Sequence, residues 1–337
     1  MGLGHTRRMD VKFYFAPLEG ITGYVFRDVY ERHFGGIEAY YSPFISTTQK
    51  KKLRNKEWND IEPAHNQGCR LVPQLMSSQA EDFVRYAQTL EECGYDQVNL
   101  NLGCPSRTVV SKGKGSGFLE RTVALERFLE QVCRESPIPV SVKTRLGRFE
   151  VDEFRELARL YSRYPLAEVI VHPRIQPEFY TGTPHWDVLE EAMPLLNMPV
   201  CLNGDIRTPQ DIEALRQRFP QSGRMMIGRG LLSYPDLIRR YQGGPAATRQ
   251  EIYEYIRDLC EQYRRVLSGD IPVLFKMKEI WSFLIDSFED GSRWKKKIHK
   301  CQKLMDYERI VEELFATLPL AERPSGKDGC RDENMDE

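Results

Sequence analysis

One cysteine of this sequence occupies a setting that suits chemistry. Cys104 lies between Gly103 and Pro105, soon after the run Gln97–Asn101, so we expect it on a turn at the end of a strand. A thiol with an ordinary pKa of about 8.5 stays protonated at neutral pH unless its surroundings lower that value, which makes Cys104 a candidate proton donor. The alternative for a lone cysteine is a small buried hydrophobic residue. That interpretation suits Cys93, Cys133, Cys201 and Cys260 better.

Two glycine-containing turns predict a site for a phosphate group. Gly204 and Gly228 have no side chains, so backbone N–H groups near them can approach a phosphate closely. Arg229 adds a fixed cation with fork geometry, and Asn203 and Asp205 complete the first turn. Either turn alone is equally typical of an ordinary loop. The prediction therefore depends on their lying together.

Gln74, Lys143 and His172 also fall at the ends of predicted strands. The amide of Gln74 can donate and accept a hydrogen bond at once, which suits the imide edge of a flavin. Lys143 would place positive charge near the flavin atoms that become anionic on two-electron reduction. A solvated lysine and a satisfied strand-end histidine are the alternatives for single residues. The joint pattern, repeated at seven strand ends, favours a cofactor site.

The elements that must position these residues alternate between strands and helices. Amphipathic helical patterns separate eight short apolar runs, and Thr208-Pro209 marks one helix start as an N-cap followed by proline. This alternation predicts a TIM (β/α)8 barrel, with an open doubly wound sheet as the alternative. The eight expected strands are Phe13–Ala16, Ile37–Tyr41, Arg70–Leu75, Gln97–Asn101, Pro139–Lys143, Glu168–Val171, Pro199–Leu202 and Arg224–Ile227.

Beyond the last expected strand the pattern becomes entirely helical, so we predict a C-terminal all-helical domain. Its expected helices are Thr248–Leu267, Val273–Phe288 and Lys297–Leu318. The predicted division is an extension over 1–10, a catalytic barrel over 11–243, an RNA-binding helical domain over 244–320 and a disordered tail over 321–337.

A basic run over residues 293–303 suggests how the helical domain could bind RNA. Its cations include Lys295, Lys296 and Lys297, with Trp294 and His299 between them. Such cations neutralise phosphates, and aromatic rings stack on exposed bases. An ordinary solvated helix face is the alternative.

Bulk properties restrict the class of protein further. The net charge of −1 identifies no polyanionic partner, so any nucleic-acid contact must be a local patch. No apolar run is long enough for a transmembrane helix, and the N-terminal residues lack the apolar stretch of a secretory signal. The eight cysteines include no CxxC pair, which favours a reducing compartment and no metal site. We therefore expect a cytoplasmic protein.

The segment Asn101-Leu102-Gly103-Cys104-Pro105 resembles the tRNA-dihydrouridine synthase family, whose pattern Asn-x-Gly-Cys-Pro is highly specific. The resemblance extends over the predicted barrel and, more weakly, over residues 275–284. At residues 231–235, Leu-Leu-Ser-Tyr-Pro replaces the Ala-Leu-Gly-Asn-Pro that members often carry, which bears on substrate contacts. The other similar segments are Ala16–Thr22, Ser141–Gly147, Val171–Arg174, Tyr180–Gly182, Asn203–Ile206 and Ile227–Gly230.

The resemblance implies tightly bound FMN, with NADPH or NADH as the reductant and tRNA as the partner. Cys104 would give a proton to C5 of a uracil whose C6 receives a hydride from the flavin. Asn101 would anchor the uracil or the flavin, and Tyr180 would shape the pocket. The flavin ring would contact Pro17, Gln74, Lys143 and His172. The phosphate would contact Asn203, Gly204, Asp205, Gly228 and Arg229.

The uracil must leave its stacked position in the RNA to reach the flavin. We expect residues 113–117 to form a mobile lid over it, with Arg107, Lys112 and Lys114 meeting phosphates around the barrel mouth. Three other functions stay open: ribosomal RNA as the substrate, a dehydrogenase of a free pyrimidine, and an RNA chaperone without catalysis. We expect no obligate protein partner.

Overall fold

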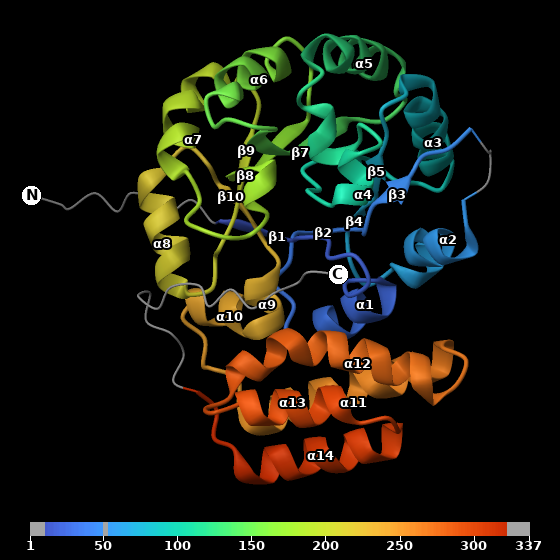
Figure 1. Cartoon of the computed structure of the whole chain (residues 1–337), viewed down its shortest axis with the longest axis vertical. Coiled ribbons are helices and arrows are strands. Elements are labelled where there is room, and N and C mark those ends of the chain that lie inside the picture. The colour runs from blue at the N-terminus through green and yellow to red at the C-terminus, as the bar shows by residue number, and fades with distance from the viewer. Residues whose placement is uncertain (1–10, 50–52, 322–337) are drawn as a thin grey trace, which may run out of the picture.

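The strands of this chain form a single parallel sheet that closes on itself. The computed structural model describes residues 11–49 and 53–321, and Figure 1 shows helices surrounding the central strands. The strand order is β3-β5-β6-β7-β8-β9-β10-β1-β2-β4. The strands are β1 (Lys12–Phe15), β2 (Ala39–Tyr41), β3 (Ile45–Ser46), β4 (Leu71–Val72), β5 (Gln74–Met76), β6 (Val98–Leu102), β7 (Val140–Gly147), β8 (Glu168–Ile175), β9 (Val200–Asn203) and β10 (Arg224–Ile227).

Two breaks explain why ten strands fill eight places around the barrel, one between β2 and β3 and one at Pro73, between β4 and β5. Pro73 separates β4 from β5 because it has no N–H to give to the sheet. Before it, β4 pairs with β2; after it, β5 pairs with β3 and β6. The Oγ of Ser42 accepts the next N–H, that of Gln74, at 2.9 Å. The expected strand Arg70–Leu75 is therefore one interrupted strand, and the predicted TIM barrel is confirmed.

Helices cover the outside of the barrel (Figure 1). The predicted start of α8 is confirmed, since the Oγ1 of Thr208 accepts the N–H of Asp211 at 3.0 Å. The helices around the barrel are α1 (Tyr24–His33), α2 (Asn55–Ile61), α3 (Ala80–Glu92), α4 (Arg107–Val110), α5 (Thr122–Glu135), α6 (Glu153–Tyr161), α7 (Trp186–Ala192), α8 (Pro209–Arg218), α9 (Arg229–Ser233) and α10 (Leu237–Tyr241). Short 3-10 helices span Pro63–His65, Gly115–Phe118, Gln176–Glu178 and Met193–Leu195.

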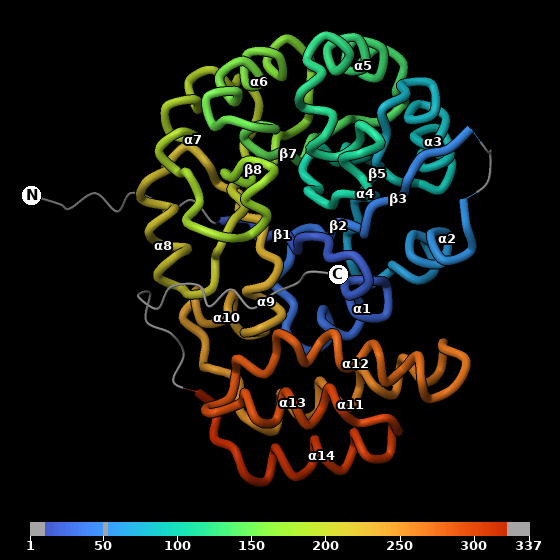
Figure 2. Tube along the Cα trace, viewed as in Figure 1, coloured from blue at the N-terminus to red at the C-terminus, as the bar shows by residue number. Residues whose placement is uncertain are grey.

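Four helices follow the barrel and stack beside α1, α9 and α10 (Figure 2). They are α11 (Arg249–Val266), α12 (Asp270–Leu284), α13 (Ser292–Lys300) and α14 (Leu304–Thr317), with a 3-10 turn at Ile285–Ser287. The expected helix Lys297–Leu318 is wrong as one element, since residues 301–303 separate α13 from α14. The proposed boundary at 243/244 falls between α10 and α11. The extension over 1–10, and the tail apart from Ala321, lie outside the described residues.

One hydrophobic core joins the two parts of the molecule. A single cluster of buried side chains runs from Phe15 of β1 to Trp281 of α12. A second cluster fills the barrel itself and includes Tyr14, Tyr41 and Cys201. The barrel is thus a packed interior, and space for chemistry lies beyond the carboxyl ends of its strands.

Candidate active site

The residues predicted to do chemistry meet at the carboxyl ends of the strands. Asn101 near the end of β6 is paired in register with Lys143 of β7. Arg145, also on β7, is paired in register with His172 of β8. The remaining barrel positions lie on or just beyond strand ends: Pro17 after β1, Gln74 in β5, Cys104 after β6, Asn203 in β9, and Gly228 and Arg229 after β10.

A chain of amides fixes the orientation of Gln74, which is fully buried. Its Nε2 donates to Oδ1 of Asn99 at 2.7 Å, and its Oε1 accepts from Nδ2 of Asn101 at 2.7 Å. Nδ2 of Asn99 in turn donates to Oγ of Ser141 at 2.9 Å. Because each of these bonds needs a donor at one end and an acceptor at the other, the chain fixes which terminal atom of each amide is oxygen and which is nitrogen. These bonds use one N–H and one lone pair of the Gln74 amide and leave one of each unused among these amides.

Hydrogen bonds hold the backbone of Cys104 from both sides. Its N–H donates to Oδ1 of Asn101 at 2.9 Å. Its carbonyl accepts the N–H of Ser116 at 3.1 Å and the Oγ–H of Ser116 at 2.9 Å. Burial raises the pKa of the Cys104 thiol, and this effect outweighs the opposing influence of a backbone hydrogen bond and of Arg145 and Lys143. The thiol is therefore a protonated group on a backbone that is held in place.

The segment predicted to be a mobile lid is packed against that cysteine. Residues 115–118 form a buried 3-10 turn. Gly115 has φ +55°, and a side chain there would come within 2.8 Å of the Cys104 carbonyl. Lys114 Nζ donates to the carbonyl of Thr47 at 3.1 Å, and burial lowers the pKa of this lysine. In this arrangement the Lys114 amine contacts a carbonyl of the protein, and its contact with a phosphate stays a prediction.

Lys143 has a partly buried amine that makes no hydrogen bond or ion pair with any residue the structure describes. Burial lowers its pKa to about 8, with Arg145 contributing in the same direction. A cation held in such surroundings without a partner is costly for the protein alone. It fits a site whose anionic ligand supplies the missing partner.

A buried network of arginines lies beyond β8 and β9. Arg174 Nη1 donates to Nε2 of His172 at 3.0 Å and to Oδ1 of Asp205 at 3.2 Å. Arg229 Nη2 donates to the same Oδ1 at 2.9 Å. Burial, with the neighbouring arginines and Lys143, holds the pKa of His172 well below its ordinary range. We therefore assign His172 as neutral, with its proton on Nδ1.

Gly204 and Asp205 form a turn with unusual backbone angles. Gly204 has φ +146° and Asp205 has φ +41°, both in the region that disfavours ordinary side chains. The Asp205 carboxylate is engaged by two arginines, so the predicted phosphate contact at this residue is limited to its backbone. At Gly230 a side chain would lie 2.0 Å from the carbonyl of Ile206, so the two turns pack directly on each other.

Arg145 was not among the predicted site residues, although it ends the same run as Lys143. It is buried, and donates to the carbonyls of Gly103 at 2.8 Å and Phe179 at 2.6 Å. Tyr180 lies between cations, with Arg145 Cζ 5.4 Å and Arg229 Cζ 4.7 Å from its ring centroid. The spacing Lys-x-Arg at the end of a strand, repeated as His-x-Arg in residues 172–174, was the signal available in the sequence.

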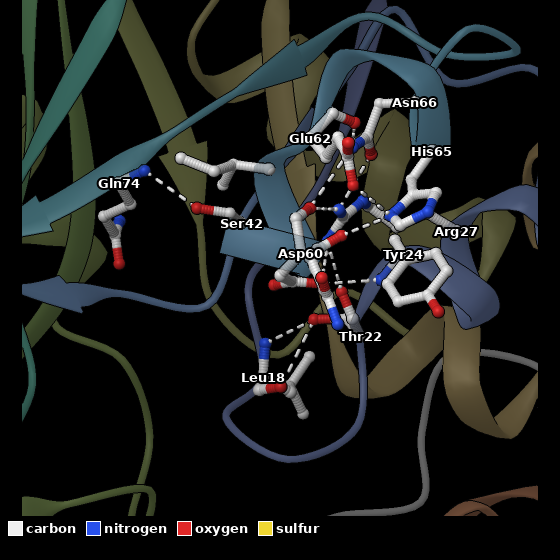
Figure 3. Close-up of polar contacts among 12 residues, drawn as sticks. Leu18, Thr22, Tyr24, Arg27, Ser42, Asp60, Glu62, His65, Asn66 and Gln74 are labelled. Carbon is white, nitrogen blue, oxygen red and sulfur yellow. Dashed lines mark hydrogen bonds and ion pairs between the residues drawn. The ribbon is translucent and has the colours of Figure 1, made fainter. Parts of the chain in front are cut away.

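A second buried arginine supports the loop after β1. Arg27 donates to the carbonyl of Thr22 at 2.8 Å and to Oδ1 of Asn66 at 2.8 Å. Asp60 accepts the N–H of Tyr24 at 2.6 Å, and Thr22 Oγ1 accepts the N–H of Leu18 at 2.8 Å. Figure 3 shows these contacts together, in the same region as the Ser42 hydrogen bond to Gln74. These contacts thus hold the backbone of the loop that carries Pro17.

Comparisons with known proteins identify the family. A family model described as "Dihydrouridine synthase (Dus)" matches residues 14–318. The chain belongs to the dihydrouridine synthase family. A "Probable tRNA-dihydrouridine synthase" of Staphylococcus aureus (strain COL) is 25% identical over 320 residues, covering 91% of this chain and 94% of the relative. "Probable tRNA-dihydrouridine synthase 2" of Bacillus subtilis (strain 168) is 31% identical over 237 residues, covering 66% and 70%.

Solved structures add support for the fold. Morphinone reductase matches with a TM-score of 0.50 and 13% sequence identity, covering 70% of this chain and 87% of that one. At this identity the likeness shows a common barrel. Within residues 11–49 and 53–321, no helix is long and apolar enough to cross a membrane, and no group of three or more His, Cys, Asp or Glu side chains could hold a metal ion.

The predicted RNA contacts of this dihydrouridine synthase fall in two places. Arg107 and Lys112 are exposed on and just after α4, which begins three residues beyond Cys104. Lys296 is exposed on α13 and Lys295 is partly exposed. Lys297 is engaged, because its Nζ lies 3.6 Å from Oε1 of Glu313 and 3.9 Å from the Trp294 ring centroid.

The predicted stacking role of Trp294 is wrong. This ring is 7% exposed and packs in the core, so it is not available to a base. The hydrophobic side of α13, formed by Trp294 and Ile298, faces the other helices. His299 is exposed and its Nε2 lies 3.2 Å from Oγ of Ser282. The helix is amphipathic, and its cations occupy the outer face together with this histidine.

Proposed function

We propose that this chain reduces the C5–C6 double bond of uridines in tRNA to 5,6-dihydrouridine, with FMN as its cofactor and NADPH or NADH as the reductant. The observation that carries the proposal is the pairing of two groups at one barrel mouth. Lys143 offers a desolvated amine without a partner among the described residues, and Cys104 offers a protonated thiol on a backbone held by Asn101 and Ser116. A cation that stabilises a reduced ring and an acid that protonates a base are the two requirements of this reaction.

The residues present fit FMN. Lys143 and Gln74 would face the polar edge of its ring, and neutral His172 can donate from Nδ1. The turn at Gly204 and the backbone around Gly228 would hold the phosphate, with Arg229 as the counter-charge. When bound and reduced, FMN supplies a hydride to C6 of the uracil.

The protein's own task is then to protonate C5. The Cys104 thiol would transfer its proton to C5 as the C6–H bond forms, leaving a thiolate that regains a proton from water. The double bond is lost, and one hydride and one proton are gained, so the product is 5,6-dihydrouridine. The raised pKa of the thiol keeps the proton on sulfur at neutral pH until the base arrives, and a general acid must be protonated at that moment.

Transfer RNA is the substrate that the named relatives favour. The uracil would be flipped out of its stack to enter the mouth. Tyr180, at 46% exposure beside Arg229, would form one wall of that pocket. A cytoplasmic location is part of this proposal, because the substrate would be found there.

The test is direct. The purified chain should carry the absorbance of a bound flavin, and with NADPH it should form dihydrouridine in unmodified tRNA, measured by mass spectrometry of nucleosides. Ribosomal RNA and uridine monophosphate are the comparison substrates. Faster product formation on either would replace tRNA as the substrate. A flavin-free protein that binds RNA without forming product would reject the proposed reaction.

A further inference from the structure

The turn after β7 displays an exposed aromatic ring at the rim of the site. Phe149 is 54% exposed. Arg148 covers part of it, with Cζ 4.7 Å from the ring centroid. Single exposed hydrophobic residues are common on protein surfaces and mean little by themselves. What distinguishes Phe149 is the construction of the turn that carries it.

The backbone of that turn is held by a single carboxylate. Glu153, in the first turn of α6, accepts the N–H of Arg148 at 2.7 Å and those of Phe149 and Glu150 at 2.9 Å each. Gly147 makes the close approach possible, because a side chain there would lie 2.6 Å from the carbonyl of Glu150. Three amides on one carboxylate fix the backbone, so the Phe149 ring is presented from a rigid base.

Side chains also connect the turn to the loop of the catalytic cysteine. Arg148 donates from Nη1 to Oε1 of Gln176, and Gln176 Nε2 donates to the carbonyl of Pro105 at 2.9 Å. Gln176 is buried, so this link is part of the interior. Gly147 of β7 pairs with Ile175 of β8, so the turn lies beside the end of β8. The backbone that carries Phe149 is therefore linked to the segment that follows Cys104.

We propose that Phe149 is a stacking platform for an unpaired nucleobase adjacent to the uridine that is reduced. This inference rests on the proposed function, since it assumes an RNA strand at the barrel mouth. A flipped nucleotide leaves its neighbours unstacked, and every base has a flat face that an aromatic ring can cover.

The surroundings favour a base over other ligands. Glu120 lies 3.5 Å from Arg148 Nε, and Glu150 is exposed on the same turn, so the charge of Arg148 is balanced and a phosphate gains little here. A protein interface needs roughly 800 Å² on each partner with an apolar centre. One ring beside charged groups is far smaller than that, but it matches the area of one base.

The experiment compares Phe149→Ala, Phe149→Leu and Phe149→Trp in the FMN-loaded enzyme, with unmodified tRNA transcript as the ligand. Loss of a stacked base should raise the Kd and the KM for tRNA by on the order of 5- to 100-fold for Ala, with kcat changed much less. Trp should restore binding, because it keeps a flat ring, and Leu should not. Met305→Ala removes an even more exposed apolar side chain from α14 and should leave the Kd unchanged.

Three results would overturn the platform. These are an unchanged Kd for Phe149→Ala, full restoration by Leu, or an equal loss in Met305→Ala. A parallel fall in the reduction of uridine monophosphate would also overturn it, since a single nucleotide has no neighbour to stack. The wild-type enzyme separates this failure from that of the proposed function. If it forms dihydrouridine in tRNA, the reaction stands whatever Phe149 does.

Discussion

Replacing Lys143 with Met should make the protein without cofactor more stable while it loses FMN. Burial lowers the pKa of this amine from its ordinary 10.5 to about 8. Since one pKa unit corresponds to about 1.4 kcal/mol, keeping Lys143 protonated in the folded chain at pH 7 costs roughly 3 kcal/mol. Met has a similar length and no charge, so Lys143→Met removes that cost. It also removes the cation that the reduced flavin would need.

The stabilising effect of Lys143→Met should depend on pH. The pKa of Lys143 is lower in the folded chain than in the unfolded chain, so the unfolded chain binds more protons between pH 8 and 10.5. The free energy of unfolding of the wild-type apoprotein therefore gains from this group as pH rises through that window. Lys143→Met has no such gain. The difference between variant and wild type should be largest at pH 7 and should shrink by roughly 3 kcal/mol toward pH 10.5.

Urea unfolding of both apoproteins at pH 7, 8, 9 and 10 measures this difference, and the titrating groups that do not interact with Lys143 cancel in the comparison. The packing of Met against its neighbours adds only a constant. Flavin content after reconstitution with FMN completes the assay. If the difference in unfolding free energy between variant and wild type stays constant with pH, the pKa of Lys143 is not lowered in the folded chain. Full FMN occupancy in the variant would refute its place in the cofactor site.

Four further outcomes follow from the site. Cys104→Ala should keep FMN and its reduction by NADPH but form little dihydrouridine; normal turnover would reject the assigned acid. Ser116→Ala keeps the backbone hydrogen bond to the Cys104 carbonyl and loses the side-chain one, worth about 1 kcal/mol. Uridine reduction should therefore slow about fivefold while flavin reduction by NADPH is unchanged. Slower flavin reduction would indicate a wider disturbance. Arg229→Ala should weaken FMN binding by at least tenfold, from a charged hydrogen bond worth roughly 1.5–3 kcal/mol, in an equilibrium titration. Changing Lys295–Lys297 to Glu should weaken tRNA binding and flatten the slope of log affinity against log salt by about one to two rather than three, because Lys297 is already paired; an unchanged slope would place the RNA elsewhere.

Much of the fold could be predicted because parallel barrel strands are buried on both sides and appear as short apolar runs. The polar residue that ends each run is then placed at the barrel mouth by the fold itself, which is why Lys143, His172 and Asn203 come together. Strands β2 to β5 were harder. Their pieces are two or three residues long, and the break at Pro73 shortens them further.

Two lysines that were expected to meet phosphates also contact other groups of the protein. Lys114 and Lys297 have long flexible side chains that can turn inward or outward, so the sequence does not say whether the amine meets water, a carbonyl or a carboxylate. The Lys114 amine donates to the Thr47 carbonyl, and the Lys297 amine lies beside the Glu313 carboxylate. Trp294 was placed on the outside because of its basic neighbours, although α13 has one apolar face to bury. The apolar periodicity of α13 predicts the burial of Trp294 better than its basic neighbours do.

The helices after the barrel also take part in building the site. Lys276 of α12 donates to the carbonyl of Gly20, in the loop that follows Pro17. Arg32 Nη1 and His33 Nε2 of α1 contact Oδ2 of Asp258 on α11, at 2.6 and 3.0 Å. Together with the shared core, these contacts mean that the helices support the β1 loop from outside while Arg27 supports it from below. Surface charges on α13 can therefore be changed without touching the flavin site, whereas removing the helices would expose the core and release the loop.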